Sequence, residues 1–251
     1  MTPPLLSVRD LNKNYGALKV ADNISFDVQP GEMHAIIGPN GAGKTTLVQQ
    51  LSGLATSTSG SVHFDGRDIT SLSFPERVRL GIARSFQITS ILPDFTVLEN
   101  AALAVQARSG SSFRFFRAAS REAALNEEAM EALGAVRLDM RADAVAGSLS
   151  HGEKRQLELA IALATKPRLL LLDEPLAGTG HEESDLLVEL MRGLKGAHAI
   201  VLIEHDMDAV FSLADRVSVL VYGRIIATDR PEAVRANAEV RAAYLGEEEV
   251  A

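Results

Sequence analysis

Residues 38–45 have the residue types and the spacing of a phosphate-binding loop. They fit the pattern G-x-x-x-x-G-K-T and read Gly38-Pro39-Asn40-Gly41-Ala42-Gly43-Lys44-Thr45. Glycines let backbone N–H groups curl around phosphate oxygens, the lysine reaches the outer phosphates, and the threonine hydroxyl suits magnesium. The alternative is a chance glycine-rich turn, but the full pattern follows an apolar segment. We therefore expect a nucleoside triphosphate with Mg²⁺ at this loop and at Thr46, which follows it.

Two acidic residues, Asp173 and Glu174, follow the apolar run at residues 169–172. If the run is a strand of an open α/β sheet, its carboxyl end lies at the edge where such sheets bind ligands. Asp173 would then hold magnesium, and Glu174 would polarise the water that attacks the terminal phosphate. A buried strand that ends in two solvated acids is the alternative, and the loop at residues 38–45 favours the catalytic interpretation.

Ser150 and Glu153 have the spacing of a capping box at the start of a helix. Capping alone would explain them. With Leu149 before them, however, Leu149-Ser150-His151-Gly152-Glu153 resembles the signature of ABC ATPases, which is usually Leu-Ser-Gly-Gly-Gln. In that family the helix presents its N-terminus to ATP held by the opposite subunit. The resemblance thus implies a head-to-tail dimer in which Ser150 and Gly152 donate to the partner's ATP.

Three single residues match the family by order and neighbourhood. The resemblance implies that Tyr15 stacks on adenine and that Gln87 contacts magnesium and the attacking water. It also implies that His205 contacts the γ-phosphate and helps to position the water, with Lys44 and Glu174 completing the catalytic set. Taken alone, each of the three could be an ordinary structural residue.

The signature region also departs from the family pattern. His151 stands where the first glycine is usual, and Glu153 replaces glutamine. The N–H groups at the helix end are still present, so phosphate binding is retained in principle. Gly180 occupies a position where many members carry an aspartate, and we assign it no role.

Four further segments resemble the ATPases of branched-chain amino-acid importers, and they lie at residues 84–87, 95–100, 203–207 and 244–247. This likeness implies a second, related ATPase, membrane permeases and an external binding protein as partners. It also implies uptake of leucine, isoleucine or valine. Importers of urea or other amides have similar ATPases, so they stay open as an alternative. The aromatic and basic patch at residues 113–117 could meet a permease or membrane, or it could pack under its own insert.

Other functions are disfavoured by what the chain lacks. A nontransport ABC ATPase acting on nucleic acid or ribosomes would usually carry two ATPase cores or long coiled coils, and this sequence has one such loop and no sustained heptads. A P-loop kinase or GTPase would leave residues 149–153 and His205 unexplained. The net charge of −8 also argues against broad binding to nucleic acid.

Composition is that of a globular protein, with 46% hydrophobic and 23% charged residues. Cysteine is absent, which excludes disulfides and thiolate metal sites. The apolar runs fall short of the roughly 18 residues that a spanning helix needs, and the first residues do not resemble a secretory signal. We therefore expect the chain at the cytoplasmic face of the membrane, attached through permease subunits.

The elements that must position these residues follow from the periodicity. We expect strand, loop and helix in succession around residues 38–45, then helices and strands that alternate again beyond residue 150. The expected elements are strands 7–11, 24–28, 33–37, 169–172 and 199–203, helices 45–51, 97–107, 122–133, 182–194 and 206–213, a hairpin at Tyr222-Gly223, and a terminal helix from Pro231. The fold expected is an α/β P-loop NTPase core with a mostly parallel sheet and an N-terminal antiparallel portion. Residues 1–87 and 151–251 would form this core, and residues 88–150 an inserted helical subdomain.

Overall fold

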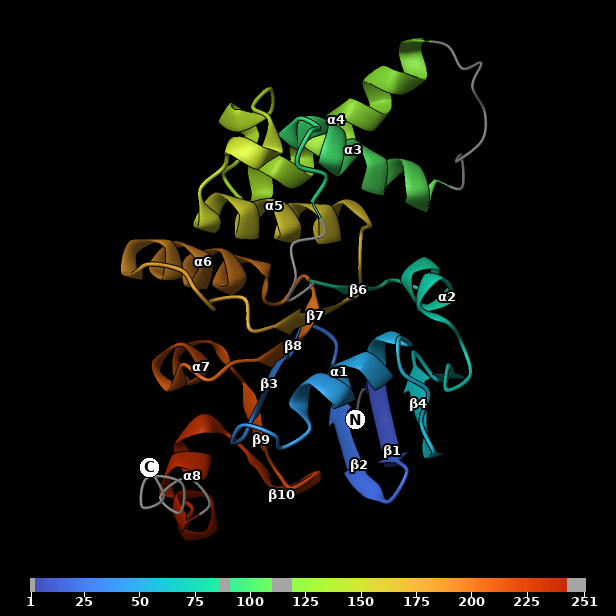
Figure 1. Ribbon diagram of the computed structural model, residues 1–251, viewed down its shortest axis with the longest axis vertical. Helices are drawn as coiled ribbons and strands as arrows, with labels where there is room; N and C mark the ends of the chain where they lie inside the picture. The colour runs from blue at the N-terminus through green and yellow to red at the C-terminus, as the bar shows by residue number, and fades with distance from the viewer. Residues whose placement is uncertain (1–2, 86–90, 110–118, 243–251) are drawn as a thin grey trace.

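Two β-sheets organise the chain in the computed structural model, which describes residues 3–85, 91–109 and 119–242 (Figure 1). The larger sheet has six strands in the order β10-β9-β3-β8-β7-β6. Neighbours from β9 to β6 run parallel, and β10 is antiparallel to β9. These strands are β3 (Met33–Ile37), β6 (Ile82–Arg84), β7 (Leu169–Asp173), β8 (Ala199–Ile203), β9 (Arg216–Val221) and β10 (Arg224–Asp229). The central strands β3, β8 and β7 are buried along their whole length, as expected of parallel strands covered on both faces.

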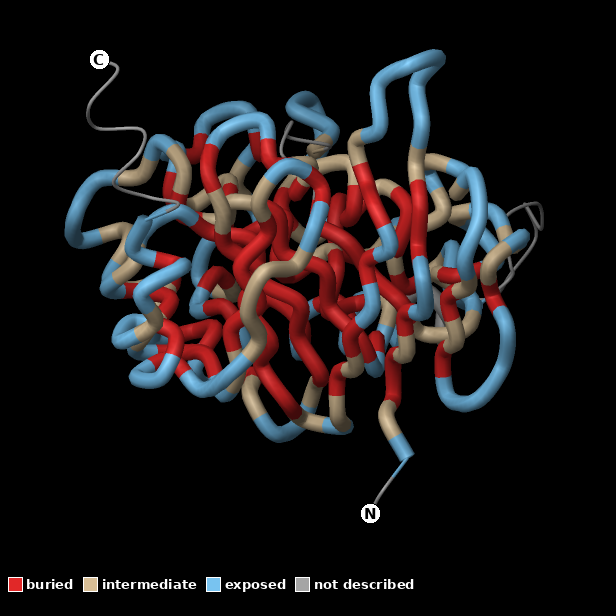
Figure 2. Tube along the Cα trace, turned by 90° about the horizontal axis from the view of Figure 1, so that it is seen from below, coloured by how far each residue is buried: buried red, intermediate tan, exposed pale blue. Residues whose placement is uncertain are grey.

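The smaller sheet is antiparallel where its pairing is described, in the order β2-β1-β4-β5. Its strands are β1 (Leu6–Tyr15), β2 (Leu18–Val28), β4 (Ser59–Phe64) and β5 (Arg67–Asp68). Helix α1 (Lys44–Ser52) packs between the two sheets, because Leu47 and Leu51 share one buried cluster with Leu6 and Ile36. Figure 2 shows this interior as a continuous buried region.

Helices cover the other face of the six-stranded sheet. Leu169 and Leu171 contribute to the cluster around α1, whereas Leu170 and Leu172 contribute to a second cluster with α5 (His151–Ala164) and α6 (His181–Leu194). Successive strand residues point to opposite faces, so α1 and α5 lie on opposite sides of the sheet. Helix α7 (Met207–Leu213) packs in the second cluster, and α8 (Pro231–Ala236) follows β10.

A helical segment lies above the sheet in Figure 1. It contains α3 (Val97–Arg108) and α4 (Ala119–Ala135), followed by short 3-10 turns at Asp139–Arg141 and Ala146–Ser148. Helices α3 and α4 pack on each other and both contact α5. None of the helices in the described ranges is long and apolar enough to cross a bilayer.

The expected α/β architecture is confirmed, and most expected elements are present within a few residues of their predicted ends. The hairpin forms between β9 and β10, where Tyr222 and Gly223 both have positive φ, as a tight two-residue connection requires. The sequence predicts no helix or strand between residues 53 and 84. There the chain forms β4, β5, β6 and the short helix α2 (Phe74–Arg79).

Candidate functional site

The glycine-rich loop joins the end of β3 to the start of α1, as the sequence predicts. A Cβ atom at Gly38 would lie 2.0 Å from the carbonyl oxygen of Leu220. At Gly43, which has φ of 103° and caps α1, a Cβ would lie 2.6 Å from the Val20 oxygen. Neighbouring backbone therefore demands glycine at both positions. The loop can keep its tight path, which leaves the N–H groups at the start of α1 available for an anion.

Lys44 is buried and folds back over the loop. Its Nζ donates hydrogen bonds to the carbonyl oxygens of Gly38 at 2.6 Å and Pro39 at 2.9 Å. Thr45 and Thr46, half-buried in the first turn of α1, follow it directly. An ammonium group, a helix N-terminus and two hydroxyl-bearing residues are thus gathered at one loop, and this donor set suits phosphate oxygens.

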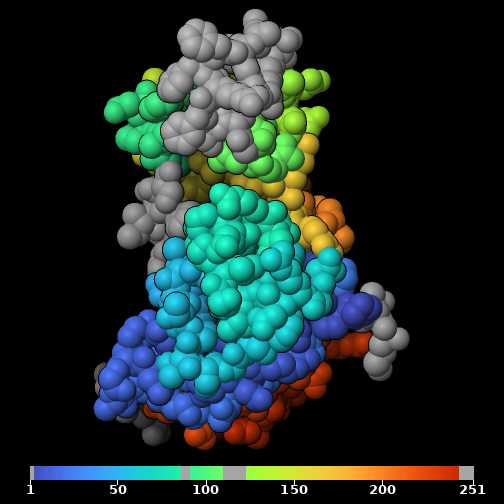
Figure 3. Space-filling model, turned by 90° about the vertical axis from the view of Figure 1, so that its right-hand side faces the viewer, coloured from blue at the N-terminus to red at the C-terminus, as the bar shows by residue number. Residues whose placement is uncertain are grey.

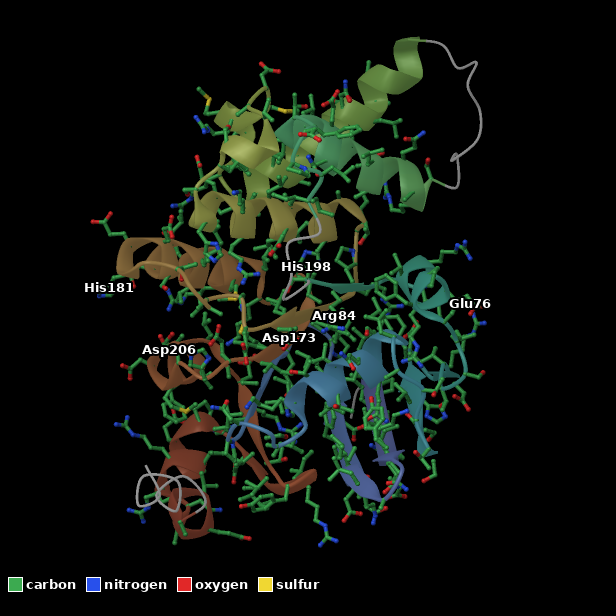
Figure 4. All side chains as sticks on the ribbon, viewed as in Figure 1. Glu76, Arg84, Asp173, His181, His198 and Asp206 are labelled. Atoms are coloured by element: carbon green, nitrogen blue, oxygen red, sulfur yellow. The ribbon has the colours of Figure 1, made fainter. Side chains whose placement is uncertain are left out.

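Asp173 lies at the carboxyl end of β7, where its carboxylate is fully buried. Its Oδ2 accepts a hydrogen bond from Nη2 of Arg84, at the end of β6, with a separation of 2.9 Å (Figure 4). Burial raises the pKa of Asp173, and Glu174 adds to that effect while Arg84 and Lys44 oppose it. Within the described ranges, Oδ1 of Asp173 is buried without a hydrogen-bond partner. A buried carboxylate oxygen that still needs a positive neighbour fits a magnesium site.

Glu174 has a strained backbone, with φ of 49°. Its N–H donates to the carbonyl oxygen of Ile203, the last residue of β8, at 2.9 Å. Non-glycine residues rarely adopt positive φ, and such strain concentrates at functional positions, where surrounding contacts hold it. The hydrogen bond to the neighbouring strand end is one such contact.

His205 follows β8 and is largely exposed, with 68% of its side-chain surface accessible. The sequence reasoning missed the residue before it. Glu204 is buried and accepts hydrogen bonds from the N–H groups of Leu176 at 2.8 Å and His205 at 2.9 Å. It therefore ties the segment after Glu174 to the loop that carries His205. The sequence does contain a signal for Glu204, because it is an acidic residue directly after a wholly apolar strand.

Asp206 caps α7, because its Oδ1 accepts the N–H of Ala209 at 3.0 Å. The structure thus brings the glycine-rich loop, the acidic pair and His205 to one edge of the sheet, at the ends of the neighbouring strands β3, β7 and β8. Gln87 and the patch at residues 113–117 lie outside the described residues.

Ser150 forms the expected capping box at the start of α5, with its Oγ accepting the N–H of Glu153 at 3.1 Å and Glu153 accepting the N–H of Ser150 at 2.8 Å. The ring of His151 reaches Ala177, with 3.3 Å between Nε2 and the carbonyl oxygen. Helices α5 and α1 pack on opposite faces of the sheet. Ser150 and Gly152 of the described structure are therefore not part of the same site as the glycine-rich loop of their own chain.

Tyr15 ends β1 at the hairpin to β2 and is 50% exposed. Nζ of Lys13 lies 4.8 Å from the centroid of its ring. An exposed ring of this kind is accessible for stacking on a base.

Comparison with known proteins identifies the family. The family model described as ABC transporter matches residues 21–177, and the one described as Branched-chain amino acid ATP-binding cassette transporter matches residues 224–250. The chain is 36% identical to the high-affinity branched-chain amino acid transport ATP-binding protein BraF of Pseudomonas aeruginosa, over 98% of this chain and 100% of BraF. It is 36% identical to LivG of Escherichia coli, the corresponding high-affinity transport ATP-binding protein, with the same coverage.

A solved structure agrees with these relatives. The ADP conformation of an ATP-binding cassette of an ABC transporter superposes with a TM-score of 0.85 at 29% identity, and it covers 98% of this chain and 100% of its own. The similarity therefore extends over sequence and fold, and it includes the segments that carry the phosphate-binding loop and the acidic pair. The chain belongs to the ABC transporter family, as an ATP-binding subunit with ATPase activity.

Proposed function

We propose that this chain hydrolyses ATP to drive an importer of branched-chain amino acids. The observation that carries the proposal is the full-length similarity to BraF and LivG, together with the match of residues 224–250 to a model for transporters of that cargo. The subunit would work at the cytoplasmic face of the membrane with permease subunits and, indirectly, with a substrate-binding protein.

In this proposal the glycine-rich loop holds the phosphates through its N–H groups and Lys44. Thr45, Asp173 and Gln87 would hold Mg²⁺, which when bound neutralises charge on the phosphates. The buried Oδ1 of Asp173 supports its part in that set. The roles of Tyr15, Pro39, Asn40, Gly41 and Ala42 in nucleotide binding stay predictions by position.

Glu174 and His205 would orient and polarise the attacking water. Both follow strands whose ends are neighbours, since β7 and β8 pair in parallel up to Asp173 and Ile203. The buried Glu204 supports this arrangement by linking the backbone of both segments. A base that accepts a proton from water needs such fixed placement.

A second ATPase subunit, identical or related, would complete the nucleotide site. Ser150 and Gly152 stand at the N-terminus of α5, on the other face of the sheet from α1. A head-to-tail dimer would bring these donors to the partner's ATP, so that ATP joins the two subunits until it is hydrolysed.

An apolar groove offers a docking place for a permease. It has a volume of about 490 Å³ and lies between α2, α3 and α5, with Val78, Ala107 and Ile161 among its lining residues. Figure 3 faces this side of the molecule, with α2 below the helical segment. Arg84 also lines the groove and pairs with Asp173. A permease segment seated there would contact both parts of the chain and a neighbour of the magnesium carboxylate.

The division into a core of residues 1–87 and 151–251 and a helical subdomain of residues 88–150 is part of the same proposal. It is supported by the helical character of the segment from α3 to the second 3-10 turn. Helix α5 contacts that segment as well as the sheet, so it is one of the elements through which the two parts meet.

Purification from membranes tests the proposal. We expect the chain to copurify with membrane permeases and its ATPase activity to rise when a binding protein loaded with leucine, isoleucine or valine is added. Stimulation by a urea- or amide-binding protein alone would replace the cargo assignment. Copurification with ribosomes or DNA in place of permeases would overturn the transport role.

The groove has its own test with a matched control. Ala107→Glu places a charge in the groove, whereas Leu103→Glu places one on an exposed position of the same helix, outside the groove lining. We expect Ala107→Glu to abolish copurification with the permeases and Leu103→Glu to leave it intact. Equal copurification of both variants would remove the groove from the interface.

A further inference from the structure

Glu183 joins the N-termini of two helices through one carboxylate. Its Oε1 accepts a hydrogen bond from Oγ of Ser150, at the N-cap of α5, over 3.2 Å. The backbone N–H of Gly152, in the first turn of α5, lies against the same carboxylate and helps to stabilise it. Its Oε2 accepts the N–H of Gly180, the N-cap of α6, over 3.3 Å. The donors that a phosphate would use on α5 are therefore engaged by an anion of the same chain.

The packing around this carboxylate is close. A Cβ atom at Gly152 would lie 2.5 Å from Cδ of Glu183, so the contact requires glycine at that position of α5. The hydrogen bonds from Gly180, Gly152 and Ser150 lower the pKa of Glu183, which keeps the group an anion near neutral pH. A helix N-terminus favours an anion through its free N–H groups and its dipole.

The start of α6 accounts for the position of the Glu183 carboxylate. Gly180 has no side chain with which to cap α6, and Glu183 reaches back from the third position of the helix to its N–H, which is half of a capping box. Glu183 is half-buried in the first turn of α6, so rotation of its side chain would move the carboxylate to solvent.

We propose that Glu183 holds Ser150 and Gly152 in the free subunit and competes with the γ-phosphate of the partner's ATP for them. This inference rests on the proposed function, because it assigns those donors to a partner's nucleotide. The Glu183 carboxylate and the γ-phosphate would need the same N–H and O–H donors. Two negative charges held next to each other at those donors would also repel. ATP-driven dimerisation must then displace the carboxylate, which makes Glu183 a positioning residue that sets the ATP concentration at which two subunits close.

The intramolecular contact is tested first, without nucleotide. Glu183→Gln removes the charge but keeps an acceptor oxygen, and Glu182→Gln removes a charge from an exposed neighbour in the same turn. We expect hydrogen–deuterium exchange at residues 150–152 to be faster in Glu183→Gln than in the wild type, and unchanged in Glu182→Gln. Equal exchange in all three proteins would overturn the proposal.

Dimerisation is tested in a Glu174→Gln background, which is expected to bind ATP without turning it over. ATP is titrated and dimer formation followed by sedimentation, with the chain alone and with any ATPase that copurifies with it. Adding Glu183→Gln should lower the half-maximal ATP concentration about five- to tenfold, the equivalent of the net contribution of one ordinary hydrogen bond. Glu182→Gln should leave it unchanged.

The failures of the two proposals are distinguishable. If the Glu174→Gln parent forms no dimer with ATP in either setting, the proposed dimeric function fails. If the parent dimerises but Glu183→Gln needs the same or more ATP, the proposed competition with the γ-phosphate is wrong. Glu183 then only stabilises the packing of α5 on α6. Glu183→Ala gives a second reading, since loss of competition should lower the ATP requirement even where loss of the α6 cap lowers the melting temperature.

Discussion

Arg84 and Asp173 form a buried ion pair that joins the ends of two neighbouring strands of the six-stranded sheet. The guanidinium Nη2 lies 2.9 Å from Oδ2 of the carboxylate, and the side chains are only 5% and 0% exposed. Figure 4 shows both side chains at the centre of the molecule. Because Arg84 also lines the apolar groove between α2, α3 and α5, the pair connects that surface to the proposed magnesium site.

Replacing Arg84 should cost stability, because it leaves the Asp173 carboxylate buried without its partner. We expect Arg84→Met to lower the free energy of unfolding by about 3–5 kcal/mol, as measured by urea denaturation without nucleotide. The double variant Arg84→Met/Asp173→Asn should recover part of that loss, since the uncompensated charge is gone. A single variant as stable as the wild type would contradict the role of the pair.

The glycine-rich loop allows a comparison between two of its glycines. A Cβ at Gly38 would collide with the backbone of Leu220, whereas Gly41 has φ of 76° with nothing within 4 Å of its Cβ. We expect Gly38→Ala to lower the free energy of unfolding by about 3 kcal/mol or more, because backbone must move. Gly41→Ala should lose only about 1 kcal/mol, the cost of positive φ for alanine. Equal losses in urea denaturation would contradict the clash at Gly38.

Glu174→Gln tests the base. The amide keeps the shape of the side chain but cannot accept a proton, so we expect ATP turnover to fall by about 10²- to 10⁴-fold. ATP affinity, measured by equilibrium binding, should stay within about threefold of the wild type, because the phosphate donors of the glycine-rich loop are unchanged. Normal turnover in this variant would refute the assignment.

Local patterns predicted much of the fold and of the site. The order of strand, glycine-rich loop and helix at residues 33–51, the acids after β7 and the cap at Ser150 all depend on residues close together in sequence. The expected strand at residues 33–37 and the one at residues 199–203 have the same bounds as β3 and β8. Such features are set by periodicity and turn chemistry, which a single sequence carries.

The unpredicted features depend on tertiary contact. Arg84 and Asp173 are separated by 89 positions, and Ser150 and Glu183 by 33. No local pattern pairs them. Strands β5 and β6 were missed because they have two and three residues, too few to show a period.

Arg77 secures the end of the helix that follows the glycine-rich loop. Buried in α2, its Nη1 donates to the carbonyl oxygens of Gln50 and Leu51, each at 2.8 Å, at the C-terminus of α1. Arg77→Lys keeps the charge but loses the planar set of donors, so we expect a loss of about 2–4 kcal/mol in the free energy of unfolding. Arg79→Lys, at an exposed position of the same helix, should change it by less than about 0.5 kcal/mol. Urea denaturation of both variants checks the difference, and similar losses would contradict the role of Arg77.

Glu158 predicts a pH dependence of stability. It is buried on α5, and burial raises its pKa above the ordinary 4.5 despite the opposing effect of Arg155, whose Nη1 lies 3.0 Å from Oε2. As pH rises from below 4.5 through the raised pKa, the unfolded chain loses its proton first, so the folded state becomes relatively less stable. Glu158→Gln removes this titration.

The free energy of unfolding of Glu158→Gln relative to the wild type should therefore increase with pH across that window and be constant above it. Urea denaturation of both proteins from pH 4 to pH 8 measures the difference, and because all other titrating groups are common to both proteins, their contributions cancel to first order. A difference that is flat or falls with rising pH would mean that the carboxylate is at least as well stabilised in the folded chain as in water, through its pairing with Arg155.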